Sequence, residues 1–181
     1  MEFRYRVSYP LEHSRQTAVY AVTDRWESDR KKVLTLLNVP PIGEIPVDEQ
    51  AQLGRDFEQR HCLRHPLLPS VSDLAARGNR LGVISSFIEG KSFATQLPLV
   101  TAQTQLEIAF DLVQLLAFLH ERDFIIGYLD PSKLFWNSQG RILVNLLLQG
   151  QRFSKGTADD QRVRYWAPEY LLEREASREA D

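Results

Sequence analysis

Histidines and a single cysteine are the residues whose types and spacing most directly suggest chemistry. His61, Cys62 and His65 lie close together, but a metal site needs more soft ligands at regular spacing. A half-buried thiol on a helix is therefore the favoured interpretation of Cys62. A hydrolase using His65 or His120 would also need a nucleophile, and no Gly-x-Ser-x-Gly motif occurs. The sequence predicts no metal site and no cofactor, and it gives a hydrolase little support.

The elements that would position these residues change character along the chain. Short runs that alternate, or that are rich in β-branched and aromatic residues, predict strands. These runs lie at residues 3–7, 17–22, 32–37, 68–74 and 81–88. A polar helix is expected at 48–63, closed by a His-Pro pair. The clearest helix is 104–121, where apolar residues recur every three or four positions. Two apolar runs around a turn at 137–140 predict a hairpin. This order predicts an α+β fold with a strand-rich part before a helical one.

Composition narrows the classes of partner. The chain of 181 residues is 43% hydrophobic and 25% charged, which is typical of a globular protein and not of a disordered one. Its formal net charge is −2 and no Lys/Arg block occurs, so nucleic acid and anionic membranes are not expected partners. The N-terminus lacks a signal-peptide apolar core, and no apolar run is long enough for a bilayer. A cytoplasmic protein is expected.

Three sequence motifs follow one another along the chain. The stretch from Leu81 reads LGVISSFIEGKSF, an apolar strand followed by an acidic-Gly-x-Ser turn. The stretch from Leu112 reads LVQLLAFLHERDFIIGYLDPSKLFWNSQGRILVNLL, a helix ending in Leu-His before a Pro-Ser dipeptide and two strands. Gly156-Thr157 precedes Ala167-Pro168-Glu169. Together they resemble the hinge, catalytic loop and activation-segment end of a eukaryotic-type Ser/Thr protein kinase. That resemblance gives His65 and His120 structural positions.

The resemblance also implies which chemical groups of the family are replaced in this chain. Kinase chemistry needs phosphate-covering glycines, a lysine, two metal-binding groups and an aspartate that orients the hydroxyl. The matching positions here are Glu12, Ser14 and Thr17 for the glycines, Thr35 for the lysine, Tyr128 for the aspartate, and Lys133 and Leu146 for the metal-binding Asn and Asp. A register slip would bring Lys32 nearer to the lysine position, but a one-residue slip reverses the faces of a strand. Asn145, one residue before Leu146, is an alternative metal ligand.

Apolar residues occupy two further positions of the family pattern. Ile126 and Leu147 replace residues that stack into an internal spine in the family, and burying such side chains contributes about 1.5–3 kcal/mol each. Leu115 and Leu116 belong to a helical stripe that the hairpin alone is not expected to cover. An uncovered patch of this kind marks an interaction surface. We expect a protein partner, a neighbouring domain or a second copy of the chain to bury it.

These features predict a kinase-like, two-lobed α+β fold. Residues 1–88 would form a strand-rich N-lobe, and residues 89–181 a partial, truncated helical C-lobe. The function expected is that of a catalytically inactive pseudokinase, a non-enzymatic domain that binds, scaffolds or regulates proteins. The alternative is a divergent, weakly active ATP-dependent Ser/Thr protein kinase, although loss of the lysine and the metal ligands removes most electrostatic stabilisation of phosphoryl transfer.

Overall fold

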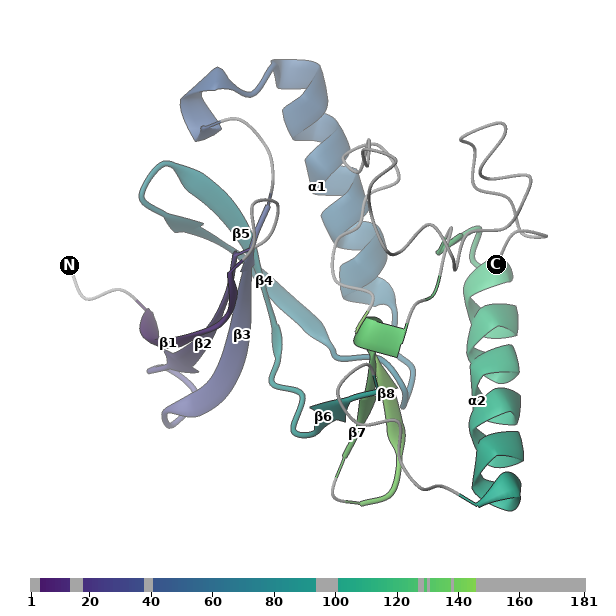
Figure 1. Ribbon diagram of the computed structural model, residues 1–181. Helices are drawn as coiled ribbons and strands as arrows, with labels where there is room; N and C mark the ends of the chain where they lie inside the picture. The colour runs from purple at the N-terminus through teal and green to yellow at the C-terminus, as the bar shows by residue number, and fades with distance from the viewer. Residues whose placement is uncertain are drawn as a thin grey trace. The chain divides into compact units, whose positions relative to one another are not determined.

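The chain divides into two compact units. The computed structural model describes residues 4–13, 18–37, 41–93, 101–126, 129, 131–137 and 139–145. Unit 1 comprises Met1–Arg64 and Pro69–Phe87, and unit 2 comprises His65–Leu68 and Ile88–Asp181 (Figure 1). The sequence-based boundary was between residues 88 and 89, and it did not assign residues 65–68 to the second unit.

Unit 1 is built on a five-stranded antiparallel sheet with the order β1-β2-β3-β5-β4. The strands are β1 (Tyr5–His13), β2 (Ala18–Asp24), β3 (Arg30–Leu36), β4 (Val71–Arg77) and β5 (Arg80–Ser86). Gly78 has a φ of 62° in the tight turn between β4 and β5, a conformation that glycine adopts without steric cost. The α+β fold class is confirmed.

Two strand predictions differ from the structure at their ends. β4 begins at Val71 and not at residue 68. Residues just before it form a turn in which the Leu68 N–H donates to the His65 carbonyl at 3.0 Å, and Pro69 has no N–H for a strand ladder. β1 extends to His13, well beyond the predicted end, because it pairs with β2 over its whole length.

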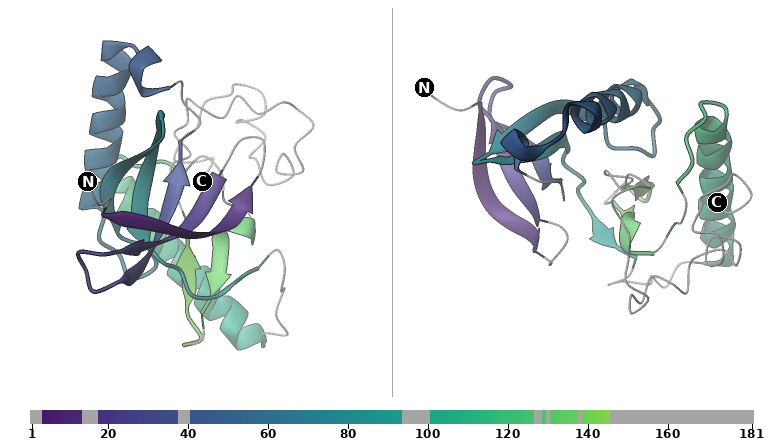
Figure 2. Two further views of the ribbon diagram at one scale, coloured as in Figure 1. Left: turned by 90° about the vertical axis from the view of Figure 1, so that its left-hand side faces the viewer. Right: turned by 90° about the horizontal axis from the view of Figure 1, so that it is seen from above.

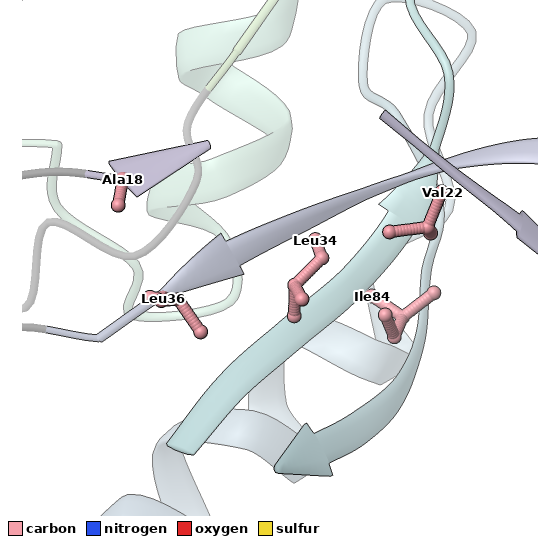
Figure 3. Packing of buried hydrophobic residues seen from close by; sticks show 5 residues of the cluster. All are labelled: Ala18, Val22, Leu34, Leu36 and Ile84. Carbon is pink, nitrogen blue, oxygen red and sulfur yellow. The ribbon is translucent and has the colours of Figure 1, made fainter. Parts of the chain in front are cut away.

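The core of unit 1 lies on one face of the sheet. Leu34 and Leu36 of β3 lie beside Ile84 of β5 and are buried together with Ala18 and Val22 of β2 (Figure 3). Gly82 leaves room for this packing, since a Cβ there would lie 2.6 Å from Leu34 Cδ1. The alternation of β3 thus sends Leu34 and Leu36 into this core and Val33 and Thr35 to the other face.

The sheet of unit 1 is curved (Figure 2), and side chains near the N-terminus join its two edges. β1 and β4 are the outermost strands. The Tyr5 hydroxyl donates to Asp73 Oδ2 at 3.0 Å, and Arg4 Nη1 lies 3.1 Å from the same oxygen. The predicted polar helix is α1 (Val47–Cys62), which follows the 3₁₀ helix η1 (Ile42–Glu44) and lies beside β4.

Unit 2 contains the long helix and the hairpin that the sequence predicts. The helix is α2 (Ala102–His120), and Thr101 caps it by accepting the Thr104 N–H at 3.2 Å. A second sheet has the order β6-β7-β8, with β6 (Lys91–Ser92), β7 (Leu134–Trp136) and β8 (Ile142–Val144), and the 3₁₀ helix η2 (Pro131–Lys133) leads into β7. β6 was not predicted. Within the described ranges, no helix is both long and apolar enough to cross a bilayer.

Candidate functional site

The position at which the resemblance expects a lysine is central in the sheet of unit 1. Thr35 lies on β3 opposite Val19 of β2 and opposite Val83 of β5. It is 5% exposed, and its Oγ1 has no hydrogen-bond partner. Ser85 is diagonal to it on the same face of the sheet, because residues two apart share a face. Its hydroxyl is also buried and without a partner. This site therefore presents two buried neutral hydroxyls.

Lys32, the residue of the register-slip alternative, is engaged in an ion pair of its own. It lies opposite Val22, three residues from Thr35 and therefore on the other face of β3. Its side chain is buried, and Nζ forms an ion pair with Glu27 Oε2 at 3.1 Å. This arrangement gives the register-slip alternative no support. The turn between β2 and β3 supplies the carboxylate that holds this lysine on the core side.

Asp56 and Glu58 of α1 are the two candidates for the helix carboxylate that pairs with the lysine in protein kinases. Asp56 Oδ1 accepts a hydrogen bond from Gln52 Nε2 at 2.6 Å, one turn earlier on α1. Glu58 is exposed. Among the described residues, no three His, Cys, Asp or Glu side chains are grouped so as to hold a metal ion. Cys62 is exposed at the end of α1 and not half-buried as predicted.

Unit 2 brings together the backbone of two residues that were predicted to matter for metal binding. Lys133 is buried at the end of η2, and its carbonyl accepts the Asn145 N–H at 2.7 Å. The pairing of Leu134 with Val144 in β7 and β8 sets this contact. The carbonyl of Lys133 is therefore used in holding the hairpin together beyond its last ladder pair.

Several predicted positions fall outside the described residues. Tyr128, Leu146 and Leu147 do so completely, as do Ser14 and Thr17. Glu12 lies on β1 opposite Val19, and only its backbone is described. Ile126 is described and buried, which agrees with a packing role, while the spine that would pair it with Leu147 stays a prediction.

Sequence reasoning missed an ion-pair cluster in unit 1. Asp24 is fully buried, and Arg4 approaches both of its oxygens, with Nε 3.0 Å from Oδ1 and Nη2 2.8 Å from Oδ2. Hydrogen bonding to Arg4 holds the pKa of Asp24 below its usual value, against the opposing effect of burial. Burial, then the hydrogen bond to Asp73, raises the pKa of Tyr5. No local spacing signals this cluster, because its members are distant in sequence.

The predicted interaction face is partly wrong. Leu115 is 1% exposed and Leu116 is half-buried, so Leu115 lies on the core side of α2 and offers no free surface. The large apolar residues that α2 exposes are Leu106, Phe110 and Val113, at 72%, 62% and 63%. The apolar residues of α2 cover more of the helix circumference than a single core-facing stripe needs. Only the burial of the side chains shows which of them face the core.

Comparisons with known proteins find a kinase-like protein by sequence and kinase domains by structure. No family model matches the chain. A "Serine/threonine-protein kinase-like protein E" from Synechocystis sp. is 24% identical over 173 residues, which are 90% of this chain and 27% of that protein. The Mycobacterium tuberculosis PknI kinase domain has a similar structure, with a TM-score of 0.70 and 22% identity over 98% of this chain and 67% of that one. A point mutant of the same domain has a TM-score of 0.69 and 21% identity, and the match covers 98% of this chain and 69% of that one.

Proposed function

We propose that this chain, which has the protein kinase-like fold, is a catalytically inactive member of that family acting as a protein-binding, scaffolding or regulatory domain. The observation that carries the proposal is Thr35, a buried residue opposite Val19 where the family uses a lysine. A neutral hydroxyl supplies no positive charge to hold phosphates, and electrostatic stabilisation is the main contribution to phosphoryl transfer.

The C-terminal half of the motif pattern supports the same proposal. Lys133 stands where the family places a metal-binding asparagine. Magnesium is held by oxygen ligands, and the side chain of lysine offers no oxygen and no acceptor for it. On this assignment, two of the groups that handle charge in phosphoryl transfer are replaced, one in each unit.

A divergent, weakly active Ser/Thr kinase is the alternative, and it depends on Asn145 as a metal ligand. Asn145 follows β8, and its backbone N–H donates a hydrogen bond to the Lys133 carbonyl. An amide oxygen can ligate magnesium, so Asn145 would have to replace the ligand missing at Leu146. This alternative leaves the replacement of lysine by Thr35 without compensation, since Lys32 is paired on the opposite face of the strand.

The proposed partners are a protein, a neighbouring domain or a second copy of the chain, and the proposed location is the cytoplasm. Nucleic acid and membranes are not proposed partners, because the formal net charge is −2 and the sequence has no basic block.

A titration with ATP and magnesium tests the proposal. Thermal unfolding is measured with millimolar ATP, with and without magnesium, and transfer of labelled phosphate is measured in parallel. A ligand at about 100 times its Kd stabilises a fold by about 2.7 kcal/mol. We expect no magnesium-dependent rise in Tm and no phosphate transfer.

Variants make the result interpretable. A magnesium-dependent rise in Tm would contradict the proposal and favour the weakly active kinase, and Asn145→Ala should then abolish it. Gln139→Ala, an exposed change in the β7–β8 turn, is the matched control. Phosphate transfer by the unmodified chain would reject the proposal outright.

A further inference from the structure

The exposed side of α2 carries one continuous apolar stripe. Leu106, Phe110 and Val113 follow one another at spacings of four and three residues, which places them on one face of a helix. All three are large side chains that are more than half exposed. Ala109 and Ala117, also exposed, lie on or beside this face and leave space for close approach. We call these five residues the α2 stripe.

The opposite side of α2 explains why the stripe is not simply part of the core. Leu115 and Leu119 are the buried residues of the helix. At 100° per residue they point roughly opposite to Phe110. The helix thus has one apolar face that is already buried and a second that is exposed, and a contiguous exposed apolar patch on a folded protein marks an interaction surface.

Acidic residues lie along one flank of the stripe. Glu107 is exposed, and its Oε1 accepts a hydrogen bond from Gln103 Nε2 at 3.1 Å. Asp111 follows one turn later on the same flank and is half-buried. The helix sequence AQTQLEIAFDLVQLLAFLH contains no lysine or arginine. The stripe therefore combines an apolar centre with negative charge on one side.

This charge distribution disfavours a second copy as the occupant. In an antiparallel pair of α2 helices related by two-fold symmetry, equal flanks face each other, so Glu107 and Asp111 would meet their own equivalents. Like charges in such positions are destabilising. In a parallel pair, the acidic flank would face the uncharged flank that contains Gln105, and the carboxylates would gain no cation.

We propose that the α2 stripe docks an amphipathic helix of another protein, with apolar residues at i, i+4 and i+7 and lysine or arginine along one side. This inference rests on the proposed protein-binding function and names the class of partner. The apolar residues of the incoming helix pack on Leu106, Phe110 and Val113, in the way that an amphipathic helix lays its apolar face on an apolar surface. Its basic side pairs with Glu107 and sets the orientation.

Two synthetic helical peptides test the inference by fluorescence anisotropy. Both carry leucine at i, i+4 and i+7, and one has lysines on the flank where the other has glutamates. We expect the lysine peptide to bind more tightly, with an affinity that falls as salt rises. Phe110→Gln should weaken binding at least about tenfold. Gln105→Ala, on the uncharged flank, should leave it unchanged.

Reversal of the flank charge gives an independent readout. Glu107→Lys should remove the preference for the lysine peptide and leave the apolar contacts in place. Because Phe110 and Glu107 are both exposed, neither change should alter thermal unfolding appreciably. A charge preference that survives in Glu107→Lys would overturn the assignment of this flank.

The other occupants have distinct outcomes, and each overturns the proposal. Self-association at micromolar concentration that Phe110→Gln abolishes would mean that a second copy covers the stripe. Failure of both peptides, with no binding of a hydrophobic dye, would mean that this chain covers its own stripe. Magnesium-ATP binding is measured separately, so the two proposals can fail independently. Binding of both the peptide and ATP would reject inactivity and keep the docking surface. Binding of neither would keep inactivity and reject the docking surface.

Discussion

Thr35 carries a buried hydroxyl at the position that the resemblance to protein kinases assigns to a phosphate-binding lysine, and Thr35→Val tests whether that hydroxyl contributes to stability. Valine has nearly the same shape as threonine and is equally suited to a strand. The substitution removes Oγ1, which has no hydrogen-bond partner, and keeps the packing against Val19 and Val83.

The expected magnitude follows from the burial of this atom. A buried polar group without a partner costs about 1–3 kcal/mol relative to one in water. Replacing it by a methyl group of similar volume removes that cost. We expect Thr35→Val to raise the free energy of unfolding by about 1 kcal/mol, the lower end of the range, because ordered water can satisfy part of the hydroxyl's need.

Urea unfolding followed by circular dichroism measures the change. Thr23→Val is the matched control on the neighbouring strand β2, because Thr23 Oγ1 lies 3.1 Å from Ser8 Oγ and has a partner to lose. The control should be neutral or slightly destabilising. If Thr35→Val instead lowers the free energy of unfolding by about 1 kcal/mol or more, on the order of one lost hydrogen bond, then Oγ1 has a partner in solution and the reasoning is refuted.

Three further predictions concern charge, pH and packing. Asp24→Asn should lower the free energy of unfolding by about 2–4 kcal/mol, since it leaves Arg4 against a buried neutral amide, whereas the exposed Asp29→Asn should change it little in the same urea titration. The lowered folded pKa of Asp24 means that its contribution is present above its unfolded pKa and is lost in acid as pH falls through the folded value. Burial, the largest cause, lowers the pKa of His65, so folding favours the neutral form of its ring. The contribution of His65 to stability should therefore be present above about pH 6.5 and decline below it. His65→Phe should remove this pH dependence from Tm measurements. Gly82→Ala should lower the free energy of unfolding by about 1–3 kcal/mol, because the added Cβ has no room. Gly54→Ala should stabilise α1 by up to about 1 kcal/mol in chemical unfolding, because a Cβ there meets nothing within 4 Å. Equal effects at the two glycines would contradict the packing argument.

Local pattern was enough to predict most of the helices and strands that the structure describes. The capped, periodic run of α2 and the turn residues between β7 and β8 act over a few positions, so they can be recognised without the fold. The same local order carried the resemblance to the kinase family and placed Thr35 at the lysine position. β6 escaped prediction because its two residues form a strand only by pairing with Phe135 and Trp136, far along the chain.

Tertiary structure alone decided which face each residue occupies. From the sequence, either Lys32 or Thr35 can be aligned with the lysine position of the kinase strand. The pairing of β3 with β2 places these two residues on opposite faces of the sheet. Leu115 and Phe110 are equally apolar, yet only one is buried. Arg4, Asp24 and Asp73 meet because the sheet brings its two edges together. Side-chain burial and ion pairing depend on contacts between distant segments, whereas turns, caps and periodicity depend on neighbours, and this is why the sequence determined the elements and the fold determined the surfaces.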